Sequence, residues 1–340
     1  MAIIREAIDD GDAGLFVSTG RLPRVELVRT LVSDAYERYR GNLDGARSDV
    51  YPALARVDPD LFGLSVASTT GEVHGMGDVD VEFAIMSVAK PFVFSLVCEE
   101  LGPEEVRTRL GVNATGRAFN SVSAIEESVD GRTNPMVNSG AIATTSLVPG
   151  ESADERWRFV LDGLSRFAGR TLALDAEVYA SASETNHRNQ SIARLLESYN
   201  RLSVDPAEAT DLYTRQSSLS VTARDLAVMG ATLAAGGVNP VTRERVVDVL
   251  SCRCTLAVMT TAGLYETSGD WLYDVGLPGK SGIGGGIVTV APGKGGLGTF
   301  APLLDDAGNS VKGQLAAAFL SRRLGMDLFI SKPAGEDSKP

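Results

Sequence analysis

The most restrictive feature of this sequence is that its two clear β-hairpin patterns lie near opposite ends of the chain. Residues 62–77 alternate like two strands around a Thr69-Thr70-Gly71 turn, and residues 285–303 do so around a glycine-rich turn. If both hairpins share one sheet, the long stretch between them is an insertion. That stretch follows the helical period, and helices are expected over 88–100, 153–168, 188–200 and 221–235.

This arrangement predicts an α/β fold in which an antiparallel sheet is flanked by helices and carries an inserted all-helical subdomain. Helical patterns at 27–40 and 311–325 would cover the sheet. A ligand is expected in the cleft between the two parts. The expected divisions are a discontinuous sheet domain of residues 1–86 and 250–330, a helical subdomain of residues 87–249, and a flexible tail of residues 331–340.

Charge and hydropathy exclude several classes of partner. The net charge of −12, without a basic run, argues against binding to nucleic acid. The first residues have no apolar core behind a basic start, and no apolar run reaches the length of a membrane span. We therefore expect a cytoplasmic protein that binds neither nucleic acid nor a membrane.

Cysteine and histidine are both scarce. Three cysteines, at 98, 252 and 254, are too few and too unevenly placed for a disulfide framework, and no ligand spacing suggests a metal site. His74 and His187 are the only histidines, neither lies in a catalytic motif, and the chain has no G-x-S-x-G elbow. A hydrolase of this sequence would therefore use another base, and we expect no metal and no cofactor.

The segment Ser87-Val88-Ala89-Lys90 is the only S-x-x-K in the chain. On a helix, residues three apart share a face, so a lysine whose pKa is lowered by burial can take the proton of the serine. Pro91 is tolerated only in a first turn, which places Ser87 near a helix start. Taken alone the motif is weak, because a surface lysine near a helix-starting serine fits it equally well.

A second motif, Lys280-Ser281-Gly282, is followed by Ile283 and three glycines. A K-[ST]-G strand facing an S-x-x-K helix is the pairing found in penicillin-recognising enzymes. The glycines would let the strand backbone approach a ligand and contribute to an oxyanion hole. A purely structural glycine-rich bend is the alternative, but the two motifs in this order favour a serine hydrolase.

Longer motifs make a resemblance specific. Between about residue 18 and about residue 325 the chain resembles the serine-dependent glutaminases, which share the β-lactamase-like fold. The matching segments are TGRLP (19–23), PALARVDPDLFG (52–63), SVAKPF (87–92), NPMVNSGAI (134–142), SVTARDLAVMG (220–230), GLYETSGDWLYDVGLPGKSGIGGGIV (263–288) and LDDAGNSVKG (304–313).

The resemblance implies catalytic roles for individual residues. Ser87 would attack the side-chain amide carbon of glutamine, and Lys90 would act as its base. The backbone N–H groups of Ser87 and Ile283 would form the oxyanion hole. Tyr213 or Tyr265 would pass a proton to the leaving ammonia. Without the resemblance, both tyrosines read equally well as core aromatics.

The resemblance also implies substrate-binding residues. Asn138 and Asn189 would hold the polar groups of the substrate, and Ser281 would lie beside the site. On sequence alone the asparagines also fit turn or helix-cap positions. Relatives commonly assemble, so a homodimer or homotetramer is expected.

Three positions in the expected substrate pocket depart from the family pattern. Ala182 stands where relatives have a glutamate for the α-ammonium of the substrate, with Glu184 as an alternative ligand two residues on. Val50 stands where relatives have a tyrosine, and Tyr51 would need a register shift to replace it. Met86 replaces a glutamine.

The sequence therefore predicts a glutaminase with an altered pocket. It would hydrolyse L-glutamine to L-glutamate and ammonia through an acyl-serine. Two alternatives remain open, an amidase for a related substrate and a non-catalytic glutaminase-like binding or scaffold protein.

Overall fold

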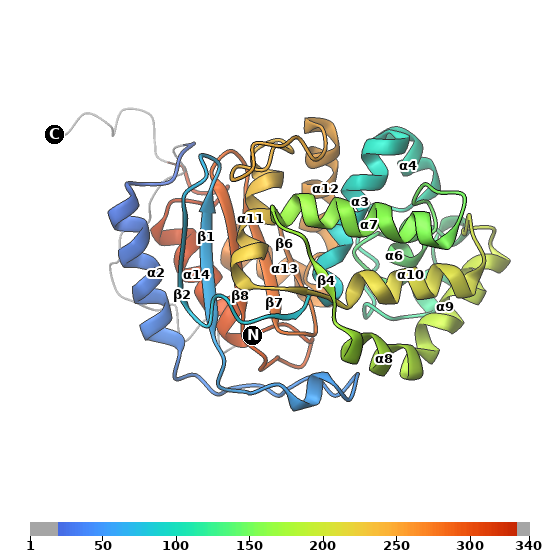
Figure 1. Ribbon diagram of the computed structural model, residues 1–340, viewed down its shortest axis with the longest axis horizontal. Helices are drawn as coiled ribbons and strands as arrows, with labels where there is room; N and C mark the ends of the chain where they lie inside the picture. Colours follow the sequence, from blue (N-terminus) through green and yellow to red (C-terminus); the bar gives the residue numbers. More distant parts are fainter. Residues whose placement is uncertain (1–19, 332–340) are drawn as a thin grey trace.

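One antiparallel sheet joins the two ends of the chain. The computed structural model describes residues 20–331. The five strands run in the order β2-β1-β8-β7-β6, so the N-terminal hairpin pairs with the C-terminal one through β1 and β8 (Figure 1). Their bounds are Gly63–Ser68 for β1, Val73–Gly77 for β2, Gly279–Ser281 for β6, Gly286–Ala291 for β7 and Gly295–Phe300 for β8. The prediction that both hairpins share one sheet is confirmed.

Helices cover both faces of this sheet (Figure 1). On one face, α2 (Val25–Tyr39) and α14 (Val311–Arg323) enclose an apolar core with the sheet. On the other face lies α11 (Ala223–Ala234). A Cβ atom at Gly296 would lie 2.3 Å from the carbonyl oxygen of Ala227, so glycine in β8 is what lets α11 pack this closely.

The part of the chain between the hairpins is mainly helical, as predicted. The patterns expected over 153–168 and 188–200 are helices α7 and α9 in the structure. The first eight helices of this part are α3 (Ala89–Leu101), α4 (Pro103–Arg109), α5 (Ser123–Glu126), α6 (Asn138–Thr145), α7 (Ala153–Ala168), α8 (Ala176–Thr185), α9 (His187–Ser198) and α10 (Pro206–Ser217). Within residues 20–331, no helix is long and apolar enough to cross a membrane.

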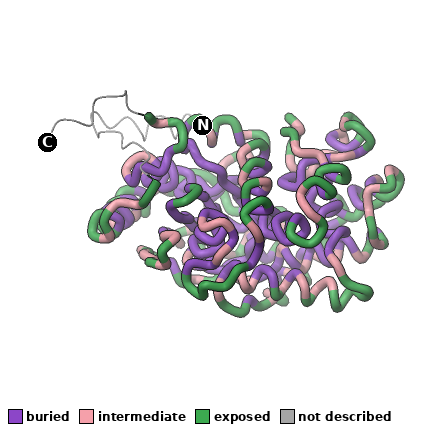
Figure 2. The backbone as a smooth tube through the Cα atoms, turned by 90° about the horizontal axis from the view of Figure 1, so that it is seen from above, coloured by how far each residue is buried: buried purple, intermediate pink, exposed green. Residues whose placement is uncertain are grey.

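Local sequence signals account for the ends of α7. The Ser152 hydroxyl accepts a hydrogen bond from the Glu155 N–H at the first turn. The helix ends where Gly169 adopts a left-handed conformation with φ of 74°. The buried side of such helices faces the centre of the molecule, and their exposed side faces outward (Figure 2).

Two helices do not pack on the part of the molecule to which the expected domain boundaries assign them. The helix α11 lies within residues 87–249, yet it packs on β1, β7 and β8. The helix α12 (Val249–Ala262) lies in the range expected for the sheet domain, yet it packs mainly on α3. The division into two domains stays a prediction, and residues 332–340 of the expected tail lie outside the described residues.

Short elements connect the two parts. Three strands form a second sheet in the order β3-β5-β4, with bounds Phe83–Ala84, Ala173–Leu174 and Leu219–Val221 for β3, β4 and β5. The remaining helix is α13 (Ser268–Val275), and the 3₁₀ turns are η1 (Leu54–Arg56), η2 (Met86–Val88), η3 (Val129–Gly131) and η4 (Tyr265–Thr267). The sequence did not predict the small sheet. It ties the segment before Ser87 to the helical part, where the Ile85 N–H donates to the Leu219 carbonyl at 2.9 Å.

The lysines of the described residues share an unusual property. Lysine is usually among the most exposed residue types. Here Lys90, Lys280, Lys294 and Lys312 are all buried, each with at most 3% of its surface exposed.

Candidate active site

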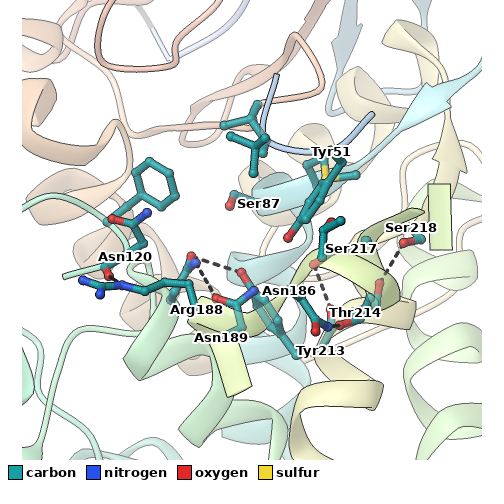
Figure 3. A pocket seen from close by; sticks show the side chains of 17 residues that line it. Tyr51, Ser87, Asn120, Asn186, Arg188, Asn189, Tyr213, Thr214, Ser217 and Ser218 are labelled. Atoms are coloured by element: carbon teal, nitrogen blue, oxygen red, sulfur yellow. Dashed lines mark hydrogen bonds between the residues drawn. The ribbon is translucent and has the colours of Figure 1, made fainter. Parts of the chain in front are cut away.

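A pocket opens between the sheet part and the helical part, and Ser87 lies in its wall (Figure 3). Its lining comes from residues 50–51, η2, residues 119–120, the helices α6, α8, α9 and α10, and Ile283 after β6. The pocket therefore lies where the sequence predicted a ligand, in the cleft between the two parts.

Ser87 sits in a strained turn just before α3. Its neighbour Met86 is buried and has a left-handed φ of 48°, which is costly for a residue with a side chain. Val88 and Ala89 have helical dihedral angles, so the turn runs directly into α3. Pro91 is the third residue of that helix, in its first turn as predicted.

The glycine-rich strand end lies against the same turn. A Cβ atom at Gly282 would lie 3.2 Å from the backbone nitrogen of Ser87, which is a tight contact, so glycine eases this close approach. The next residue, Ile283, lines the pocket. The structure thus brings the chain around Ile283 beside the backbone of Ser87, where the two N–H groups were predicted to form an oxyanion hole.

Lys90 is buried one helical turn from Ser87, with 2% of its surface exposed. Its Nζ donates to Asn138 Oδ1 at 2.7 Å and to the Met136 carbonyl at 3.5 Å. Burial lowers the pKa of Lys90 to about 7. A lysine with this pKa is partly neutral at physiological pH and can accept a proton.

Two asparagines and a tyrosine form one buried network around Lys90. Asn138 Oδ1 also accepts a hydrogen bond from the Tyr213 hydroxyl at 3.1 Å, and Asn138 Nδ2 donates to Asn189 Oδ1 at 2.9 Å. All three residues line the pocket. Because Asn138 Oδ1 receives two donors, the orientation of its amide is fixed, and the network holds Lys90 in place.

The two tyrosines remain proton donors at neutral pH. Burial raises the pKa of Tyr213, and it raises the pKa of Tyr265 to about 12. A hydrogen bond with the Ser87 side chain acts in the opposite direction on both pKa values. The Tyr265 hydroxyl donates to the Ser281 carbonyl at 3.3 Å. Of the two, Tyr213 lines the pocket and Tyr265 does not.

Lys280 and Ser281 lie on the buried side of the site. Lys280 Nζ donates to the carbonyls of Gly263 at 2.8 Å and Ser281 at 2.6 Å, and it lies 4.3 Å from the centre of the Tyr265 ring. Burial, together with the charge of Lys90, lowers the pKa of Lys280. The Ser281 hydroxyl has no hydrogen-bond partner within residues 20–331.

The structure separates the two candidates for an ammonium ligand on α8. Ala182 is buried and lines the pocket, as the motif register predicted. Glu184 is exposed and is not among the residues that line it. Val50 and Met86 also line the pocket, so all three substituted positions face the same space.

Tyr51 is a pocket residue whose position the sequence left open. Its side chain lies beside Ser87 and lines the pocket (Figure 3). Burial raises its pKa, and a hydrogen bond with Asn189 partly opposes this. The sequence named Tyr51 only as a residue that would need a register shift to replace the tyrosine expected at position 50.

Eight further residues that line the pocket had no predicted role. They are Phe119, Asn120, Thr185, Asn186, Arg188, Thr214, Ser217 and Ser218. Arg188 Nε donates to the Asn120 carbonyl at 3.0 Å. Arg188 follows directly from the R-N motif that placed Asn189, so the same motif could have indicated it. Within the described ranges, no three His, Cys, Asp or Glu side chains cluster closely enough to hold a metal ion.

Fold and comparisons together define a hydrolase of the β-lactamase-like class. Residues 45–329 match the family model for glutaminase. The chain belongs to the glutaminase family.

Relatives and solved structures agree with this. Glutaminase 2 of Yersinia pestis is 66% identical over 338 residues, which are 99% of each chain. A glutaminase of Brucella suis biovar 1 is 51% identical over 288 residues, 85% of this chain and 91% of its own. The solved structure of the probable glutaminase ybaS has a TM-score of 0.89 at 42% identity and covers 91% of this chain and 100% of its own. That of Mglu in its native form has a TM-score of 0.85 at 36% identity and covers 90% of this chain and 75% of its own.

Proposed function

We propose that the protein hydrolyses the side-chain amide of L-glutamine to L-glutamate and ammonia, with Ser87 as nucleophile and Lys90 as base. The observation that carries the proposal is the placement of Lys90. It is buried one turn from Ser87, its pKa is lowered to about 7, and within residues 20–331 its Nζ donates hydrogen bonds to the neutral oxygens of Asn138 and Met136. A lysine in that state is an effective general base near neutral pH.

The proposed reaction has two halves. Neutral Lys90 takes the hydroxyl proton as Ser87 Oγ attacks the amide carbon, and the N–H groups of Ser87 and Ile283 stabilise the negative oxygen. The carbon–nitrogen bond then breaks as ammonia leaves with a proton passed on by Tyr265 or Tyr213. Water, deprotonated by Lys90, attacks the acyl-serine ester and releases the acid and free Ser87.

Asn138, Asn189 and Tyr213 support the binding half of the proposal, because their polar atoms border the space beside Ser87. The substrate is a small molecule that fits among these side chains. Assembly as a homodimer or homotetramer and a cytoplasmic location stay predictions from the sequence.

The test is an ammonia-release assay on purified wild type, Ser87→Ala, Lys90→Ala and the double variant. Each single change should reduce kcat by several orders of magnitude, and the double variant should be no worse, because the two residues act as one unit. Ser95→Ala is the matched control, since Ser95 is a second buried serine on the adjoining helix. It should keep wild-type turnover.

The same variants separate catalysis from binding alone. Mass spectrometry of quenched wild type should detect an acyl adduct on Ser87. Retention of most turnover by Ser87→Ala would refute the mechanism. Tight binding of glutamine with neither ammonia nor an adduct would favour a non-catalytic binding protein instead.

A further inference from the structure

We infer that this pocket prefers a short ω-carboxamide that carries a carboxylate but no α-ammonium group, and that it takes such a substrate better than it takes glutamine. The inference rests on the proposed function, because it assumes amide hydrolysis at Ser87. It concerns the other end of the substrate, which the pocket must recognise.

The lining of the pocket offers an ammonium no counter-ion. Among the described residues that line it there is no aspartate and no glutamate, and the single charged side chain is Arg188. The wall also contains the apolar side chains of Val50, Met86 and Ala182. A charged group that leaves water for such a space without an ionic partner is strongly disfavoured.

The charges behind the wall have the same sign as an ammonium. Lys90 and Lys280 are buried next to the site, and their hydrogen bonds go to amide and carbonyl oxygens. When either lysine is protonated, its charge repels a substrate ammonium across a region of low dielectric constant. The same charges attract an anionic substrate.

Two carboxylates on the helices of the pocket wall already have partners. Glu177 on α8 forms an ion pair with Arg56. Asp211 on α10 pairs with Arg215 at 2.8 Å and accepts a hydrogen bond from Tyr179. Recruiting either one to an ammonium would break an existing interaction. Within the described part of the chain Glu184 forms no ion pair, but its side chain is exposed and does not line the pocket.

Arg188 supplies a site for a carboxylate. Its Nε is taken by the Asn120 carbonyl, and within residues 20–331 it forms no ion pair with an acidic side chain. A guanidinium presents several donors in one plane and binds carboxylates in a bidentate manner. The pocket therefore combines Ser87 for the amide with Arg188 for an acid group, and adds only neutral donors between them.

The test compares kcat/KM for ammonia release from three amides of one chain length. These are L-glutamine, glutaramate (the same molecule without its α-amino group) and pentanamide, which lacks the carboxylate as well. We expect glutaramate to exceed glutamine by about tenfold or more, the effect of one unpaired buried charge. Pentanamide should be poorer than glutaramate.

Two variants assign the effect to residues. Ala182→Glu should raise kcat/KM for glutamine and lower kcat/KM for glutaramate. Ala182→Gln adds a side chain of the same length without a charge, so it should not raise kcat/KM for glutamine relative to glutaramate. Arg188→Gln should lower kcat/KM for glutaramate at least tenfold and leave pentanamide nearly unchanged. An equal loss on both amides would overturn the role of Arg188.

The three rates of ammonia release separate a failure of the substrate preference from a failure of amide hydrolysis itself. If wild type hydrolyses glutamine as well as or better than glutaramate, and Ser87→Ala abolishes both, the inference is wrong and the glutaminase mechanism stands. If wild type releases ammonia from none of the three amides, the proposed function itself fails.

Discussion

Replacing Lys90 with methionine should abolish turnover and at the same time stabilise the fold at neutral pH. Methionine has a similar length and no charge, so it fills the same buried space. The native protein holds Lys90 at a pKa of about 7, whereas the unfolded chain has the ordinary lysine value of 10.5. At pH 7 and below, the proton therefore binds this side chain more favourably in the unfolded chain than in the native protein, and this lowers the free energy of unfolding.

The magnitude follows from the pKa difference and the lost contacts. Each pKa unit corresponds to about 1.4 kcal/mol, so burial of the amine costs up to about 5 kcal/mol at pH 7. Methionine removes the Nζ donor of Asn138 Oδ1, which costs about 1–3 kcal/mol, although the Tyr213 hydroxyl at 3.1 Å still donates to that oxygen. The net gain in free energy of unfolding should be about 2–4 kcal/mol. The variant also removes the repulsion between the charges of Lys90 and Lys280, which adds to the gain in stability.

The pH dependence identifies the cause. Between pH 7 and 10.5 the unfolded chain binds more protons at residue 90 than the native protein does, so wild-type stability gains from this group as pH rises. The advantage of Lys90→Met should thus be largest at pH 7 and below, and should shrink by at most about 1.4 kcal/mol per pH unit towards pH 10.5.

Urea unfolding of wild type and variant from pH 6 to pH 10 measures this difference. Ser87→Ala is the control and should show the wild-type pH dependence. A difference between Lys90→Met and wild type that does not change with pH, or a variant less stable at pH 7, would show that Lys90 is not held neutral by burial.

Three further predictions follow from the site. First, kcat/KM should rise with pH through about 7 and then level off, because only neutral Lys90 accepts the proton of Ser87; a flat profile between pH 5 and 8 would contradict this assignment. Second, ammonia release should survive exhaustive chelation, and activity lost to EDTA but restored by zinc would rule out the serine–lysine mechanism. Third, Tyr51→Phe should raise KM by about 3- to 10-fold with little change in kcat, the effect of one neutral hydrogen bond; steady-state kinetics showing an unchanged KM would place Tyr51 outside substrate binding.

The sequence predicted those strands and helices whose hydrophobic periodicity is strong. The strands β1 and β8 and the helices α7 and α9 carry clear patterns, and the structure has them where expected. Ser87 and Lys90 could be predicted as a pair because one turn of helix fixes their relation, and their catalytic roles stay a prediction. Motif order placed Asn138 and Asn189, and the structure joins their side chains by a hydrogen bond.

Other features depend on tertiary contacts that no local pattern encodes. A helical period in α11 says that one face is buried, but it does not say whether a sheet or other helices bury it. The strands β3 and β4 have two residues each, which is too short for alternation to be recognised. The side chains of Ala182 and Glu184 are two residues apart on one helix, and only the structure shows that they point to different surroundings.

The burial of every described lysine has a consequence for chemical labelling. Reagents that acylate primary amines find Lys90, Lys280, Lys294 and Lys312 only when the structure around them opens. Labelling of these four sites, resolved by peptide mass, would therefore report the opening of each region separately. Labelling of Lys90 would thus report how often the native protein exposes this amine, one helical turn from Ser87, to solvent.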